Sequence, residues 1–237
     1  MSELCEDISE FLLKTGFSSL DARIFEPAFT HPSYSFEHSL SQDECYERLE
    51  FLGDAVLKLL VSNLLYKKYP DYQEGKMTNI RAILVSDDFL FNLAEDLNLK
   101  KYLRISNSLE KEGGRNIPSI SACAFEAFLG KLYEIGIPIE EILGFISKMY
   151  LKYIEDIGSF LPKFNSKTLL QEYTQSKNKD LPQYELISTN GAENNCNFSV
   201  KVLYHGEELG VGVGKTKKQA EREAAYQACI KLNITGE

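Results

Sequence analysis

A stretch with helical periodicity, residues 45–69, constrains the fold of this chain more than any other segment, and it ends at Pro70. Three acids in this stretch, Glu47, Glu50 and Asp54, stand at relative positions 0, 3 and 7. At about 100° per residue, that spacing places all three carboxylates on one helix face, with the apolar residues largely elsewhere. We therefore expect a long helix with one acidic face.

Such an acidic face has two interpretations. Like charges on one helix face repel, by roughly a few tenths of a kcal/mol per pair, unless a cation lies among them. Carboxylate oxygens without other donor types favour a hard divalent cation such as Mg2+ or Mn2+. The alternative is an amphipathic helix whose acidic face is simply solvated. The spacing alone leaves both interpretations open.

The distribution of charge divides the chain into two parts. The formal net charge of the whole chain is −9. Residues 1–162 hold 16 Lys and Arg against 26 Asp and Glu, whereas residues 163–237 hold 10 against 9. The negative charge thus lies where a metal site would need it. The second part is nearly neutral, and overall charge gives little support for RNA binding, because RNA-binding proteins are more often plainly basic.

The sequence favours a cytoplasmic protein. No apolar run approaches the length of a membrane span, and the acidic N-terminus lacks the layout of a signal peptide. The five cysteines show no C-x-x-C spacing, which is typical of a reducing compartment and predicts neither a disulfide framework nor a zinc site. We therefore expect no membrane association.

Periodicity and chain-breaking residues predict two domains joined by a linker at residues 158–166, which contains Pro162. The domain before it, residues 1–157, should be all-α. The domain after it, residues 167–234, should be a small α+β domain of the order α-β-β-β-α. Its elements are expected as a helix at 167–176, strands at 183–188, 197–204 and 207–214, and a helix at 217–231.

Within the helical part, turn and cap signals locate further boundaries. Asp87 and Asp88 predict a break and a new helix start. Ser119 is expected to be the N-cap of a later helix that carries Cys123 and Glu126.

Residues 47–56 read Glu-Arg-Leu-Glu-Phe-Leu-Gly-Asp-Ala-Val, and this segment resembles the signature of ribonuclease III, an endonuclease of double-stranded RNA. Further segments match in the family's order: Phe-Thr-His-Pro-Ser-Tyr at 29–34, Glu-Gly-Lys-Met-Thr at 74–78 and Phe-Glu-Ala-Phe-Leu-Gly at 125–130. The resemblance covers nearly the whole chain and favours the metal interpretation of the acidic face.

The resemblance implies a metal-dependent phosphodiester hydrolase. Glu50, Asp54 and Glu126 would bind Mg2+, or Mn2+ as a substitute, and Asp54 and Glu126 would be catalytic. Glu47 and Glu74 would have supporting roles, and no small-molecule cofactor is expected. Cleavage of double-stranded RNA would leave 5′-phosphate and 3′-hydroxyl ends.

The resemblance also implies a homodimer, in which each subunit contributes one cluster of acids and cuts one strand. Staggered cuts would leave a short 3′ overhang. Phe51 matches an aromatic residue at the family's dimer interface. Precursors of ribosomal RNA, messenger RNA and other RNAs are the substrates that the family leads us to expect.

One position departs from the family. The helix that carries Glu126 has an aspartate three residues earlier in the family, whereas this chain has Cys123 there. Residues i and i+3 share a helix face, so Cys123 should still point at the site. A thiol is a soft ligand poorly suited to Mg2+, and the site therefore loses one of four expected carboxylates. We expect this site to bind Mg2+ more weakly than a site with four carboxylates would. Mn2+ should support activity at a lower concentration than Mg2+.

The last part of the chain, with Lys-Lys-x-Ala-Glu-x-x-Ala-Ala at 217–225, resembles the double-stranded-RNA-binding domain. Lysines at the N-terminus of its last helix, where backbone N–H groups also favour anions, should reach phosphates across a groove. The resemblance implies RNA contacts by Gln171, Glu172, Asn194, Lys215, Lys217 and Lys218. Asn194 stands where the family usually has a histidine. The alternative is that these lysines are merely solvated.

Two functions follow from these patterns. The first is an endoribonuclease, favoured because the acids at 47, 50, 54, 74 and 126 are all present. The second is a catalytically impaired double-stranded-RNA-binding protein on a retained dimer scaffold, in which Cys123 marks a lost site.

Overall fold

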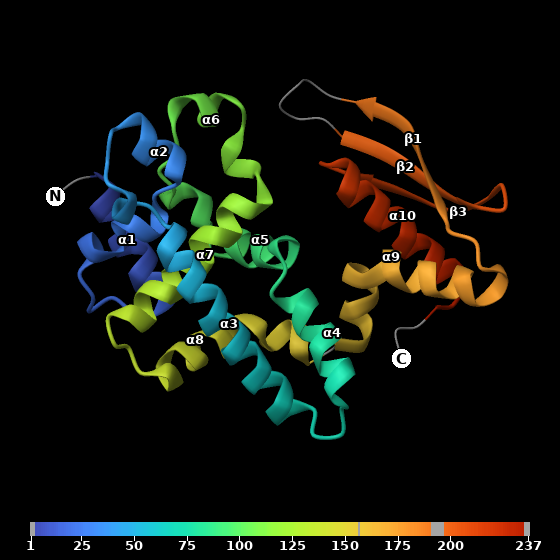
Figure 1. Ribbon diagram of the computed structural model, residues 1–237, viewed down its shortest axis with the longest axis horizontal. Coiled ribbons are helices and arrows are strands. Elements are labelled where there is room, and N and C mark those ends of the chain that lie inside the picture. The colour runs from blue at the N-terminus through green and yellow to red at the C-terminus, as the bar shows by residue number, and fades with distance from the viewer. Residues whose placement is uncertain (1–2, 156, 191–196, 235–237) are drawn as a thin grey trace. The chain divides into compact units, whose positions relative to one another are not determined.

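The computed structural model describes residues 3–155, 157–190 and 197–234 (Figure 1). The chain forms two compact units, with the boundary between Leu151 and Lys152. A helical unit is followed by one that contains a sheet, so the predicted fold class is confirmed. Among the described residues, no helix is both long enough and apolar enough to cross a membrane.

The first unit is helical, as predicted, with 3-10 helices (η) among its α-helices. In chain order the helices are α1 (Glu3–Thr15), η1 (Ala22–Phe29), α2 (Pro32–Glu37), η2 (Gln42–Glu44), α3 (Glu47–Lys68), α4 (Glu74–Leu84), α5 (Asp87–Asp96), η3 (Leu99–Tyr102), α6 (Asn107–Lys111), η4 (Gly114–Asn116), α7 (Pro118–Glu134) and α8 (Ile139–Ile154).

Two predicted helix starts have different outcomes. The start at Asp87 is confirmed, because α5 begins there and the Ser86 hydroxyl accepts a hydrogen bond from the Phe89 N–H at 3.4 Å. The prediction of Ser119 as an N-cap is wrong, because α7 begins at Pro118, before that serine. Proline suits the first helical position, since its φ is already helical and its missing N–H would have no partner there.

Helices α3 and α7 pack against each other at a pair of glycines. A Cβ at Gly53 of α3 would collide with the backbone of Glu126, and a Cβ at Gly130 of α7 would collide with the backbone of α3. The two helices therefore approach to backbone contact. This close approach places the acidic face of α3 beside Glu126.

The second unit has the order α-β-β-β-α, as predicted. Its elements are α9 (Ile157–Asn178), β1 (Gln183–Asn190), β2 (Asn197–Tyr204), β3 (Glu207–Gly214) and α10 (Lys217–Lys231). The strands form an antiparallel sheet in the order β1-β2-β3, and α9 and α10 cover one of its faces (Figure 1). Leu170, Val202 and Ala224 join both helices to the sheet in one buried core.

Residues 158–166, which the sequence predicts to be a linker, are helical in the structure. They lie within α9, which includes Pro162. A proline inside a helix removes one backbone hydrogen bond, and the packing of α9 within the second unit offsets the cost in stability. Ser166 is buried, and its hydroxyl donates a hydrogen bond to the Arg222 carbonyl oxygen of α10 at 2.8 Å. The end of the predicted linker thus belongs to the second unit. The unit boundary at 151–152 also precedes the predicted domain end at 157.

Candidate catalytic site and RNA-binding surface

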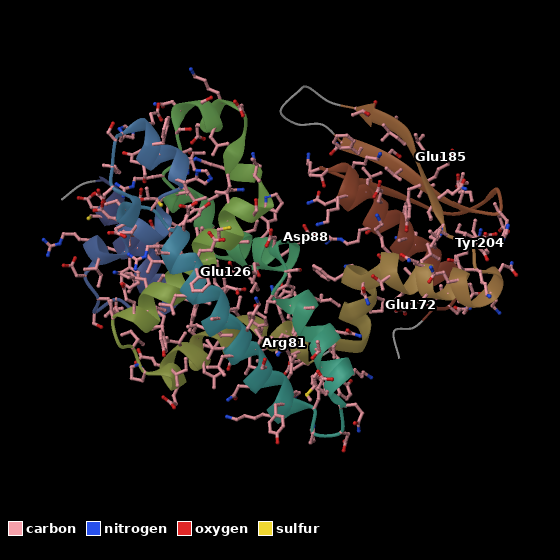
Figure 2. All side chains as sticks on the ribbon, in the orientation of Figure 1. Arg81, Asp88, Glu126, Glu172, Glu185 and Tyr204 are labelled. Carbon is pink, nitrogen blue, oxygen red and sulfur yellow. The ribbon has the colours of Figure 1, made fainter. Side chains whose placement is uncertain are left out.

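A cavity of about 730 Å³ in the first unit brings the predicted acids together. Its lining includes Glu47, Glu50 and Asp54 from α3 and Glu126 from α7. Figure 2 marks Glu126 on α7 and Arg81 on α4, and Arg81 also lines the cavity. The helical spacing and the α3–α7 contact therefore gather four carboxylates around one space.

Glu126 is the acid whose surroundings are least favourable to a negative charge. Only 9% of its surface is exposed, and among the described residues it has no hydrogen-bond or ion-pair partner. Burial, followed by the like charges of Asp54, Glu50 and Asp87, raises the pKa of Glu126 to about 8. A buried carboxylate without a partner is costly, so the site favours an added proton or an added cation.

Cys123 interacts with an acid of the site rather than lining the cavity. Its thiol forms a hydrogen bond with the Glu50 carboxylate. Burial, that hydrogen bond and the neighbouring acids raise the pKa of Cys123 far above its usual range, so the group is a neutral thiol. Burial raises the pKa of Glu50 as well. The position where the resemblance expects an aspartate therefore carries a hydrogen-bond donor instead of an anionic oxygen.

Asp54 already has a cationic partner. Its carboxylate lies 2.6 Å from the Lys58 ammonium group, one turn further along α3, and both side chains are partly exposed. In the described part of the chain, no three His, Cys, Asp or Glu side chains converge into a ready metal site. The donors themselves, carboxylate oxygens around a cavity, are of the type that hard divalent cations require. Lys58 contacts one carboxylate oxygen of Asp54, Oδ2, and would compete with such a cation for it.

Asp87 and Arg81 line the cavity, but the sequence did not predict them as site residues. Asp87 begins α5 and lines the cavity, although only its helix-start signal was visible in the sequence. Arg81 of α4 donates a hydrogen bond to the Ser62 hydroxyl at 3.0 Å and also lines the cavity. No local pattern could have found either role, because both depend on how α4 and α5 pack beside α3.

Glu74 lies apart from the other acids. It lines a second cavity of about 400 Å³, between α3 and α4, and its carboxylate accepts a hydrogen bond from the Thr78 hydroxyl at 3.0 Å. The two cavities share Thr78 and Arg81. Glu74 is therefore placed beside the acidic cavity and not in it.

Large apolar side chains of α3 are exposed along its length. Phe51 is 82% exposed, and Leu59 and Tyr66 are also exposed. Phe51 lines the acidic cavity as well. These side chains make an apolar surface on the same helix that carries the carboxylates.

The predicted RNA-binding lysines lie around the start of α10. Lys215, Lys217 and Lys218 are all exposed. The Thr216 side chain caps α10 by accepting a hydrogen bond from the Gln219 N–H at 3.1 Å. Such a capped helix start combines exposed cations with the positive end of the helix dipole, which is suited to phosphate.

The remaining predicted RNA contacts are only partly described. Gln171 and Glu172 are exposed on α9, where Figure 2 marks Glu172. Asn194 lies outside the described residues.

Comparison with known proteins relates both units to described families. The family model called Ribonuclease-III-like matches residues 21–154, and the model called Double-stranded RNA binding motif matches residues 166–232. Ribonuclease 3 of Listeria welshimeri is 42% identical over 217 residues, which cover 92% of this chain and 94% of that protein. Ribonuclease 3 of Bacillus licheniformis is 37% identical over 227 residues, which cover 96% and 90%.

A solved structure is also similar to the first unit. The nuclease domain of ribonuclease III from Campylobacter jejuni is 30% identical and has a TM-score of 0.56. The match covers 61% of this chain and 96% of that one. That structure is described by its flexibility in a region involved in dimer formation.

Proposed function

Because this chain belongs to the ribonuclease III family, as an endoribonuclease with a double-stranded-RNA-binding domain, we propose that it hydrolyses duplex RNA with a divalent cation. The products would carry 5′-phosphate and 3′-hydroxyl ends. The observation that carries this proposal is Glu126, a nearly buried carboxylate without a partner among the described residues, facing a cavity lined by Glu50 and Asp54.

The acids would hold Mg2+, with Mn2+ as a substitute. When bound, such an ion lowers the pKa of water and neutralises charge that develops on phosphate oxygens. Glu50, Asp54 and Glu126 would supply the oxygen ligands, and Lys58 would compete with the ion for Asp54. Glu47 supports the cluster from the same face of α3. No side-chain nucleophile is required.

The active form would be a homodimer. The exposed Phe51, Leu59 and Tyr66 of α3 give an apolar surface beside the acids, which suits contact with a second copy. The related Campylobacter jejuni domain is described with a region involved in dimer formation. Each subunit would then cut one strand of the duplex, and staggered cuts would leave a short 3′ overhang.

The second unit would hold the duplex through Lys215, Lys217 and Lys218, with Gln171 and Glu172 reaching the minor groove. Precursors of ribosomal and other RNAs are the proposed substrates. The cytoplasm is the proposed location, supported by Cys123 and Cys229, whose free thiols suit a reducing compartment. The non-catalytic alternative is not favoured, because the carboxylates around the cavity are retained.

Single-turnover cleavage of a labelled RNA duplex tests the proposal. With Mg2+ the wild type should cut, whereas Glu126→Gln should lose cleavage and keep duplex binding, because it removes a metal ligand and no RNA-contacting cation. Glu140→Gln, an exposed carboxylate on α8, is the matched control and should cut like the wild type. Cleavage by Glu126→Gln at the wild-type rate would show that the assigned site is wrong.

A further inference from the structure

The acidic cavity lacks an anionic oxygen at the position where the family resemblance places one. Cys123 carries a thiol there instead of a carboxylate, and it is not among the residues that line the cavity. A divalent cation bound there would therefore meet one oxygen ligand fewer from α7. Another element that borders the same cavity could supply it.

Asp87 is placed to do so. It is the first residue of α5, a helix that packs against α7, and its exposed side chain lines the cavity with Glu50 and Glu126. In the described part of the chain, Asp87 has no hydrogen-bond or ion-pair partner. Its negative charge also acts on Glu50, Cys123 and Glu126, where it helps to raise their pKa values.

A second observation points to a ligand at this place. Glu126 is nine-tenths buried, lines the same cavity, and has no partner among the described residues. Two carboxylates from different helices, α5 and α7, thus border one cavity, and neither has an ion-pair partner among the described residues. Buried charges in proteins are paired or coordinate metals.

We propose that Asp87 is a ligand of the divalent cation and supplies the carboxylate that Cys123 does not. The oxygen donors would then be Glu50, Asp54, Glu126 and Asp87, a set suited to a hard cation. This inference rests on the proposed function, because it concerns the same site. It differs from the family expectation in drawing a ligand from α5.

Binding of Mn2+ alone to the full-length protein, without RNA, tests the proposal by the loss of the free-ion EPR signal. Asp87→Asn should weaken Mn2+ binding by roughly tenfold or more, the scale expected when a metal site is damaged. The matched control is Asp88→Asn. Asp88 is in the same first turn of α5, so its change removes the same charge and the same interaction with the helix dipole, but Asp88 does not line the cavity. That variant should bind Mn2+ within about threefold of the wild type.

Rescue separates a ligand from a structural residue. Cys123→Asp in the Asp87→Asn background should restore much of the lost Mn2+ affinity, because it adds an oxygen beside Glu50. If Asp87→Asn and Asp88→Asn weaken Mn2+ binding equally, or if neither weakens it, Asp87 is not a ligand. The proposed function would still stand in that case, provided that the wild type binds Mn2+ and cleaves duplex RNA. A wild type that neither binds Mn2+ nor cleaves duplex RNA with it would overturn both.

Discussion

At the scale of single residues, the cavity concentrates negative charge in surroundings that a folded protein tolerates poorly. Glu126 is nearly buried, and Glu50 has its pKa raised mainly by burial. Among the described residues, Asp54 is the one of these three acids that forms an ion pair, with the Lys58 ammonium group. The metal-free site should therefore cost stability that a bound cation would restore, because a ligand that binds only the folded state stabilises it.

We predict that Glu126→Gln stabilises the metal-free protein. Burial and neighbouring acids raise the pKa of Glu126 from 4.5 to about 8, so the folded state keeps a proton that the unfolded chain releases. The wild type should lose stability relative to the variant as pH rises from 4.5 to about 8. Thermal unfolding in EDTA at pH 5 and pH 8 measures the difference in melting temperature between the wild type and the variant. Each kcal/mol of stability should shift the melting temperature by about 2–4 °C. Equal melting temperatures at pH 8 would contradict this account of Glu126.

Lys58 should compete with the cation for Asp54. An exposed ion pair is worth about 0.2–1 kcal/mol, so we predict that Lys58→Gln lowers the metal concentration for half-maximal Mn2+ binding by about two- to fivefold. Lys67→Gln, an exposed lysine further along α3, is the control and should change it little. A higher metal requirement in Lys58→Gln would mean that the ammonium group assists the site.

At the scale of elements, the contact between α3 and α7 positions the acids. We predict that Gly53→Ala destabilises the protein by about 1–3 kcal/mol, because its Cβ would meet the backbone at Glu126. Cleavage should fall as well, since any shift of α7 moves Glu126. Gly144→Ala in α8 is a control with the opposite sign, because a Cβ there meets nothing within 4 Å and alanine favours helix by about 0.5–1 kcal/mol. Chemical unfolding of both variants measures the two effects, and a neutral Gly53→Ala would refute the close contact.

The elements also show which features the sequence could predict. A helix fixes the angle between residues, so spacing alone put Glu47, Glu50 and Asp54 on one face. The acidic pair Asp87 and Asp88 predicted where α5 begins. Its place in the cavity depends on how α5 packs beside α7, which no local pattern encodes.

Other features depend on packing in the same way. The hydrogen bond from Cys123 to Glu50 joins two helices. The helix through Pro162 persists against a local breaking signal, since Ser166 and Leu170 of α9 pack into the second unit. Family resemblance supplied the ligand roles, and the metal-binding geometry itself stays a prediction.

At the scale of the whole molecule, one unit would cut and the other would hold the duplex. We predict that Lys217→Ala with Lys218→Ala weakens binding across all duplex sequences and reduces the slope of log K against log salt by about one to two units. Lys177→Ala with Lys179→Ala removes the same charge from exposed positions at the end of α9 and just after it, and should leave the slope nearly unchanged. Equal slopes for the first pair and the wild type would mean that these lysines do not contact phosphate.

The central claim is that each subunit of a dimer holds one complete carboxylate site that cuts one RNA strand. The most direct measurement uses mixed dimers, purified through two different tags, in which one subunit is wild type and the other carries Glu126→Gln. With Mg2+ and a duplex labelled on both strands, these dimers should nick one strand and leave the other intact. Cleavage of both strands by the mixed dimer, at rates like those of the wild type, would contradict the account.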